Sequence, residues 1–86
     1  MEKYRVELTA SAEKALHRLS PQALPKILQA IQTLAINPFP QGCRKLTGQQ
    51  DIYRIRVQVY RIIYEVHEDV VLVKVLKIGH RKDVYR

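Results

Sequence analysis

The sequence predicts an α+β domain with the element order β-α-α-β-β-β-β, in which an N-terminal helical hairpin packs on one face of a small, mostly antiparallel, twisted sheet. Two observations lead to this fold class. In the first half of the chain, a short alternating segment is followed by apolar residues at helical spacing. In the second half, apolar residues recur at strand spacing. The 86 residues leave room for one hydrophobic core, so we expect residues 1–86 to form a single domain.

The first two elements are expected to be a strand and a short helix. Residues 3–9 alternate apolar and charged side chains, which is typical of a half-buried strand. Thr9 or Ser11 suits the N-cap of the helix that follows, because each carries a hydroxyl that can accept a bond from a free N–H. The apolar positions of this helix are Ala12, Ala15, Leu16 and Leu19.

A second, longer helix is expected to follow directly. Ser20 suits its N-cap and Pro21 its first position, although Pro25 leaves open a start at that later residue. The segment 37–40, Asn-Pro-Phe-Pro, ends it. Its apolar stripe consists of Leu24, Ile27, Leu28, Ile31, Leu34 and Ala35.

The second half of the chain is expected to be strands joined by short turns. Residues 52–58 alternate apolar side chains with arginines, and the segment from residue 70 is almost continuously apolar and β-branched, as in a central strand. The predicted strands are 44–47, 52–58, 59–67 and 70–78.

Charge is concentrated in this second half. The net charge is +7, and residues 44–86 carry ten Lys or Arg against five acids, while residues 1–43 carry five against three. No apolar run is long enough for a membrane span and the N-terminus does not resemble a signal peptide, so we expect a cytoplasmic protein without a membrane partner. The single cysteine, Cys43, and three scattered histidines give no metal-ligand spacing.

Three arginines are expected to share one exposed face of the sheet. Alternation puts Arg54 and Arg56 on the same side of their strand, and Arg61 on the corresponding side of the next. Guanidinium groups gathered at one spot bind a phosphodiester and stabilise negative charge on it. The alternative is a solvated face on which the arginines pair with Asp51 or Glu65.

Aromatic side chains add to the case for a nucleic acid. A tail carrying Arg81 and Tyr85 follows the last strand and can fold over the arginine face. Tyr85, Tyr53 or Tyr60 could then stack on an unpaired base, as recognition of single-stranded RNA requires. Composition and pattern alone therefore leave both interpretations open, a site for RNA and a solvated arginine face.

Four motifs in order along the chain resemble the RelE branch of the RelE/ParE toxin superfamily. They are Lys-Leu-Thr-Gly at 45–48, Tyr-Arg-Ile-Arg at 53–56, Tyr-Arg-Ile-Ile-Tyr-Glu-Val at 60–66 and Ile-Gly-His-Arg-Lys-Asp-Val-Tyr at 78–85. The helical hairpin and the Asn37-Pro38 loop fit as well, so the resemblance covers essentially the whole chain.

The resemblance implies a RelE-like fold and a toxin of a type II toxin–antitoxin pair. Such a toxin enters the ribosomal A site and cuts the mRNA there, by attack of a ribose 2′-hydroxyl on the adjacent phosphate. It implies no metal and no cofactor. The implied partners are a cognate antitoxin, whose extended or helical segment wraps the domain, and mRNA on the ribosome.

The resemblance also assigns expected roles to residues of this chain. Arg61 matches a phosphate-binding arginine, Arg81 the arginine that stabilises the transition state, and Tyr85 a tyrosine that positions or deprotonates the nucleotide. His80 is a further candidate for proton transfer, because its unperturbed pKa lies near neutrality. The residues expected to contact RNA are Arg54, Arg56, Lys45 and Lys82.

Two positions depart from the family pattern. RelE-type enzymes often have lysine at one or both of the positions held here by Arg54 and Arg56, and arginine cannot act as a general base near neutral pH. Proton transfer is therefore left to Tyr85 or His80. Residues 58–59 are Gln-Val where many relatives have a Gly-Asp type turn, so we expect an unusual hairpin.

Two other functions remain open from the sequence. One is a ParE-like toxin that inhibits DNA gyrase by binding and cleaves nothing. The other is a degenerate homologue that keeps the fold and the antitoxin surface without activity. The full set of arginines and Tyr85 favours the nuclease over both.

Overall fold

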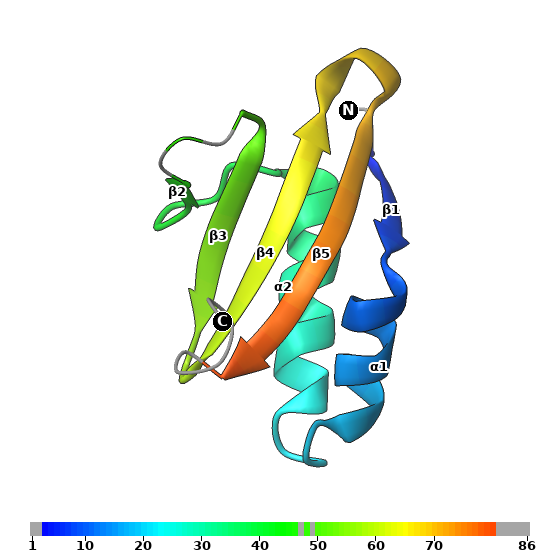
Figure 1. Cartoon of the computed structure of the whole chain (residues 1–86), viewed down its shortest axis with the longest axis vertical. Coiled ribbons are helices and arrows are strands. Elements are labelled where there is room, and N and C mark those ends of the chain that lie inside the picture. The colour runs from blue at the N-terminus through cyan, green and yellow to red at the C-terminus, as the bar shows by residue number, and fades with distance from the viewer. Residues whose placement is uncertain (1–2, 47, 49, 81–86) are drawn as a thin grey trace.

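The computed structural model describes residues 3–46, 48 and 50–80. Within them five strands form one sheet in the order β1-β5-β4-β3-β2, and only β1 and β5 are parallel neighbours. Both helices lie on the same side of the sheet, behind it in Figure 1. The predicted element order and architecture are confirmed. The elements are β1 (Arg5–Leu8), α1 (Ala10–Arg18), α2 (Leu24–Ile36), β2 (Arg44–Lys45), β3 (Ile52–Val57), β4 (Tyr60–His67) and β5 (Leu72–His80).

Of the two predicted starts of α2, the one at Pro25 agrees with the structure to within one residue and the one at Pro21 is wrong. Ser20 accepts a bond from the N–H of Ala23 at 3.2 Å, which closes a turn before the helix, and Pro21 lies in that turn. The helix begins at Leu24, so Pro25 occupies the first turn, where its missing N–H has no partner to lose. Leu28 was predicted to face the core but is 40% exposed. Neither helix in the described residues is long and apolar enough to cross a membrane.

Alternation along the strands separates a core face from an open face. Even-numbered residues of β4 and odd-numbered residues of β3 turn toward the helices, and their neighbours turn away. The core joins these side chains to the buried stripe of α2, and its fully buried members include Ile27, Leu34, Ile62, Tyr64, Val73 and Val75. This packing decides which charged side chains the other face presents.

A bulge at Leu76 interrupts the alternation of β5. Tyr64 pairs with Val75, but Ile63 pairs with Lys77, so Leu76 is left without a partner in β4. The Thr9 hydroxyl donates to the Leu76 carbonyl at 2.7 Å and accepts from the N–H of Ala12 at 3.1 Å. Thr9 is therefore the N-cap of α1 and also holds the bulge in place.

Strand ends deviate from the predictions where the backbone turns. β2 has two residues instead of four, and β5 begins at Leu72 because Glu68–Val70 form a 3₁₀ turn and Val71 takes a left-handed φ of 53°. The hairpin between β3 and β4 is unusual, as expected, since Gln58 takes a φ of 58°. Non-glycine residues are strained in this region.

The loop after α2 is tied to the sheet by Tyr64. This side chain is fully buried, and its hydroxyl donates to the Pro38 carbonyl at 2.8 Å. The Tyr53 ring stacks against it at 6.0 Å between centroids, and Phe39 meets Tyr53 edge-on at 5.1 Å. Burial, with a smaller effect of the neighbouring Cys43, raises the pKa of the Tyr64 hydroxyl above its usual value.

We predict that Gln58→Gly stabilises the protein. Glycine adopts a positive φ without the steric cost that Gln58 pays, so the free energy of unfolding should rise by about 0.5–1 kcal/mol, or roughly 4 °C in melting temperature. Thermal unfolding measures this. Val59→Gly, in the same turn but not at positive φ, is the control and should destabilise. A lower free energy of unfolding in Gln58→Gly than in the parent would contradict the inference that the backbone is strained at Gln58.

We also predict that Tyr64→Phe destabilises the protein by about 1–3 kcal/mol at neutral pH, because the buried Pro38 carbonyl loses its donor. Above about pH 10 the unfolded chain ionises this tyrosine while the folded chain keeps it neutral, so stability falls as pH rises. In Tyr64→Phe, which has no hydroxyl to ionise at this position, the free energy of unfolding should fall less steeply above about pH 10. Denaturant unfolding at several pH values tests it, with Tyr53→Phe as control; identical pH slopes in Tyr64→Phe and the parent would refute it.

Candidate anion-binding site

Arg54, Arg56 and Arg61 lie together on the open face of the sheet. Arg56 is directly opposite Arg61 in the β3–β4 ladder, and Arg54 is opposite Ile63. The N–H of Val66 donates to the Asp51 carbonyl, so by alternation Arg56 and Arg61 form a non-hydrogen-bonded pair, in which side chains approach most closely. Gly79 faces Arg61 from β5 and leaves space for its long side chain.

Arg44 joins these three arginines, although it was not among the predicted site residues. It is the register partner of Arg54, so the two side chains emerge on the same face. The register of a two-residue strand depends on the turn that precedes β3, and no sequence pattern indicates it. We name the set Arg44, Arg54, Arg56 and Arg61 the arginine cluster.

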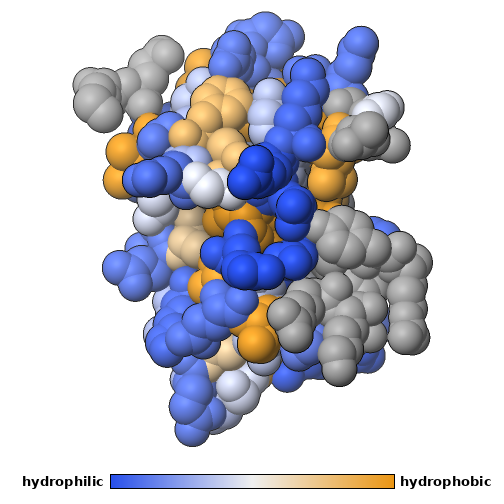
Figure 2. All heavy atoms as spheres, turned by 90° about the vertical axis from the view of Figure 1, so that its left-hand side faces the viewer, coloured by the Kyte–Doolittle hydropathy of each residue, from blue (hydrophilic) through white to orange (hydrophobic). Residues whose placement is uncertain are grey.

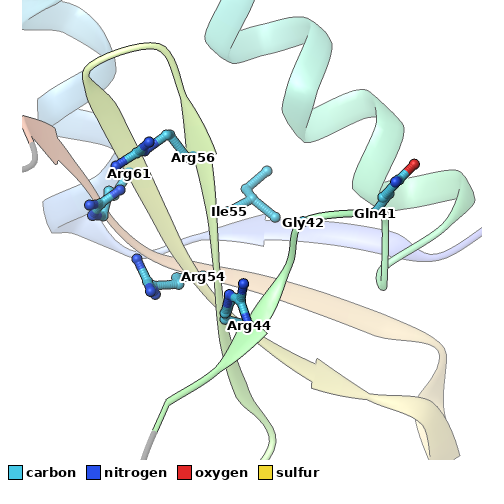
Figure 3. A pocket seen from close by; sticks show the side chains of 7 residues that line it. All are labelled: Gln41, Gly42, Arg44, Arg54, Ile55, Arg56 and Arg61. Carbon is cyan, nitrogen blue, oxygen red and sulfur yellow. The ribbon is translucent and has the colours of Figure 1, made fainter.

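The arginine cluster lines a cavity of about 410 Å³ at the edge of the sheet. Figure 3 shows Arg54, Arg56 and Arg61 on one side of β3 and β4, with Ile55 pointing the opposite way, toward α2. Gly42, at a φ of 93°, turns the chain into β2 and closes one wall of the cavity. Gln41 and Ile55 complete the lining, to which the described part of the chain contributes no carboxylate.

No acid neutralises the arginine cluster within the described residues. The ion pairs found there join Arg5 to Glu7 and His67 to Glu65, so Glu65 is engaged elsewhere and Asp51 pairs with no arginine. The Nε of Arg61 is buried and finds no acceptor among residues 3–46, 48 and 50–80. The alternative interpretation of a solvated face paired with Asp51 or Glu65 does not fit this geometry.

Like charges set opposite each other in a sheet are destabilising, and the ladder holds two such pairs, Arg44 with Arg54 and Arg56 with Arg61. An anion bound between paired arginines attracts both of them and so replaces their repulsion by attraction. It also accepts a hydrogen bond from the buried Nε of Arg61. Arginine offers planar, bidentate bonds that match phosphate and carboxylate oxygens. The cluster is therefore suited to bind a phosphate or carboxylate group.

Other predicted site residues do not join the cluster. Lys45 is opposite Tyr53 and shares its face, on the helix side of the sheet. His80 is opposite Tyr60, whose ring it meets edge-on at 6.3 Å between centroids, and lines a separate cavity with Lys14 and Arg18 of α1.

Three tyrosines, Tyr53, Tyr60 and Tyr85, were expected to stack on a base. Tyr53 and Tyr60 pack against the core on the helix side, so stacking on a base at the arginine face was a wrong expectation for both. Arg81, Lys82 and Tyr85 lie outside the described residues, and their roles stay predictions.

Comparison with known proteins gives the family. Residues 6–85 match the family described as ParE toxin of type II toxin-antitoxin system, parDE. A Methanocaldococcus jannaschii protein named toxin RelE1 is 32% identical, covering 98% of this chain and 97% of its own. Toxin RelG of Mycobacterium tuberculosis is 31% identical, covering 96% and 97%.

The fold is similar to solved RelE structures. RelE in the crystal structure of the archaeal RelE–RelB complex from Pyrococcus horikoshii superposes with a TM-score of 0.83 at 31% identity, over 95% of this chain and 99% of that one. The predicted RelE-like fold is thus confirmed. The chain belongs to the ParE toxin family of type II toxin–antitoxin systems and is a toxin of the RelE type.

Proposed function

We propose that this toxin is a metal-independent endoribonuclease that cuts mRNA in the ribosomal A site. The proposal is carried by the arginine cluster, in which the described residues place no carboxylate and leave one buried guanidinium nitrogen without an acceptor. A phosphodiester supplies the acceptors that this cluster lacks. The RelE and RelG names of the relatives support the same class of toxin.

In the proposed reaction the RNA supplies the nucleophile and the arginines of the chain stabilise the transition state. The ribose 2′-oxygen attacks the adjacent phosphorus and the bond to the 5′-oxygen of the next nucleotide breaks, which gives a 2′,3′-cyclic phosphate and a 5′-hydroxyl. Negative charge grows on the phosphoryl oxygens in the transition state, where Arg61 and Arg56 stabilise it. Arg54 and Arg44 hold the neighbouring backbone.

Proton transfer needs a group other than the arginines, which stay protonated. One proton leaves the 2′-hydroxyl and one must reach the departing 5′-oxygen. His80 lies on the helix side, away from Arg61, so its geometry favours a structural role beside Tyr60. Tyr85 is our candidate for proton transfer and Arg81 for additional charge stabilisation, on the resemblance alone.

The second candidate is a gyrase inhibitor, favoured by the ParE name of the matching family. The relatives at more than 30% identity carry RelE or RelG names. We therefore place RNA cleavage first.

We predict that Arg61→Ala lowers the rate of mRNA cleavage on programmed ribosomes about 100-fold or more, because removing one preformed donor to a charged transition state typically costs that much. Primer extension maps the cuts, which should fall within the A-site codon. Arg61→Lys keeps the charge but loses bidentate bonding, and should recover only part of the rate.

Arg18→Ala is the matched control, because it removes one exposed arginine from α1, away from the cluster. It should cleave nearly as fast as the parent. Intact mRNA in the presence of a parent protein that still arrests growth would reject the nuclease. A gyrase supercoiling assay would then decide for the second candidate.

A further inference from the structure

A groove of about 400 Å³ runs between β3 and α2. Pockets that bind small organic groups have volumes of roughly 300–1,000 Å³, so one flat ring fits into it. Figure 2, which looks onto this edge of the sheet, shows apolar surface between hydrophilic side chains. The face that α2 presents to the groove consists of Lys26, Gln29, Ala30 and Thr33, which follow one another at helical spacing.

The groove is continuous with the cavity of the arginine cluster, because Gln41, Ile55 and Arg56 line both. In Figure 3 Ile55 points from β3 toward α2, while Arg56, its neighbour in the strand, points away from the helix to the cluster. A ligand whose anionic group lies among the arginines therefore has its next part within reach of the groove. In a nucleotide, a single sugar joins the phosphate to the base.

Apolar side chains line the groove from both sides. Ile55 and Val57 come from β3 and Ala30 from α2, and all three pack against the core. A flat ring between them would have both of its faces removed from water, and proteins that bind a single base hold it between apolar side chains in this way. Within the described residues no carboxylate lines the groove, so the described lining does not repel the phosphates of an RNA strand.

Two carboxamides stand at the groove, those of Gln29 on α2 and Gln41 beyond the end of this helix. Both side chains are exposed, and neither forms a hydrogen bond with the part of the chain that the structure describes. A carboxamide carries a donor and an acceptor side by side, which match the N6 amino group and N7 of adenine. The Thr33 hydroxyl donates to the Gln29 carbonyl at 3.0 Å, so its oxygen stays available as a further acceptor.

We propose that the groove binds the base of the nucleotide next to the phosphate held by the arginine cluster, with adenine preferred. The proposal rests on the function proposed above. Arg56 holds the phosphate, the apolar walls cover the two faces of the base, and Gln29 or Gln41 hydrogen-bonds to its edge. The toxin thereby contributes a sequence preference of its own to the choice of the cleaved RNA.

Adenine fits the groove better than guanine does. Guanine presents two acceptors on the same edge and pairs with arginine or lysine. Arg56 is turned to the cluster, and Lys26 lies in the first turn of α2, whereas Gln41 follows the end of this helix. Lys26 is therefore at the far end of the groove from the arginine cluster, where a further phosphate of the strand would meet it.

Other occupants fit less well. A second copy of this chain brings its own net charge of +7, which repels the arginines and Lys26 at the groove. A divalent cation finds no carboxylate among the described residues that line the groove.

The test measures binding of short RNA to the full chain in the absence of ribosomes. The probes are tetranucleotides whose 2′-O-methyl groups block the attack on phosphorus, with adenosine or an abasic residue on either side of the central phosphate. At one of these two positions the abasic probe should bind at least about tenfold more weakly by calorimetry. Only the adenosine probe should shift the amides of Ala30 and Thr33 in NMR spectra. Equal affinity of the two probes at both positions, or shifts that spare α2, would overturn the proposal.

Variants locate the base without touching the arginines. Ala30→Leu fills the groove and should lower the affinity for the adenosine probe to that for the abasic probe. The double variant Gln29→Ala/Gln41→Ala should lose the preference for adenosine over guanosine. Gln32→Ala, exposed on the same helix outside the groove, is the matched control and should bind as the parent does. A preference for guanosine in the parent, or an unchanged preference for adenosine in the double variant, would reject the reading of the base edge.

The outcome for the groove is separate from the outcome for the nuclease. A parent protein that binds the adenosine probe more tightly than the abasic one but leaves mRNA intact on ribosomes would reject only the function proposed above. A parent protein that cleaves mRNA but binds both probes equally would reject only the base site. An adenosine probe that binds Ala30→Leu as tightly as the parent would also reject the base site.

Discussion

The packing of α2 against one face of β3, β4 and β5 is the constraint on which the rest of the structure depends. Because side chains alternate along a strand, each apolar residue that enters the core sends its neighbour to the open face. Ile55 and Ile62 in the core place Arg54, Arg56 and Arg61 together outside it. The fold thus assembles like charges that would otherwise avoid one another, and the free energy of the core offsets their repulsion.

A second constraint acts at the end of β5. The bulge at Leu76, held by the Thr9 hydroxyl, shifts the alternation by one residue, so Ile78 and His80 turn to the helix side. Strict alternation from Val75 would have put His80 on the arginine face. Before Gly79, β5 is apolar apart from Lys74 and Lys77, which lie three residues apart yet share the open face. This odd spacing is the trace of the bulge in the sequence, and the bulge is located only when Thr9 is seen beside Leu76. Proton transfer by His80, proposed from the chemistry of its imidazole, is disfavoured by this geometry.

Elements with a strong period were predictable, and features that depend on register were not. The i, i+3, i+4 stripe of α2 and the alternation of β3 and β4 identified both helices, the sheet and three of the four cluster arginines. Arg44 was missed because β2 is two residues long and its register is fixed by the turn before β3. The start of α2 was left open between Pro21 and Pro25 because Ser20, which caps a turn before the helix, carries the same signal as a helix N-cap. The sequence signals of an N-cap do not distinguish a capped turn from a capped helix.

We infer that the core holds the arginine cluster against its own repulsion, which leaves the cluster ready to receive an anion. The most direct measurement is the free energy of unfolding of Arg56→Gln and of the parent at low ionic strength, with and without phosphate. Without phosphate, Arg56→Gln should be more stable than the parent by about 0.2–1 kcal/mol, since it removes a like charge opposite Arg61. Phosphate should stabilise the parent more than the variant. A variant that is less stable than the parent without phosphate, with equal gains from phosphate in both, would contradict it.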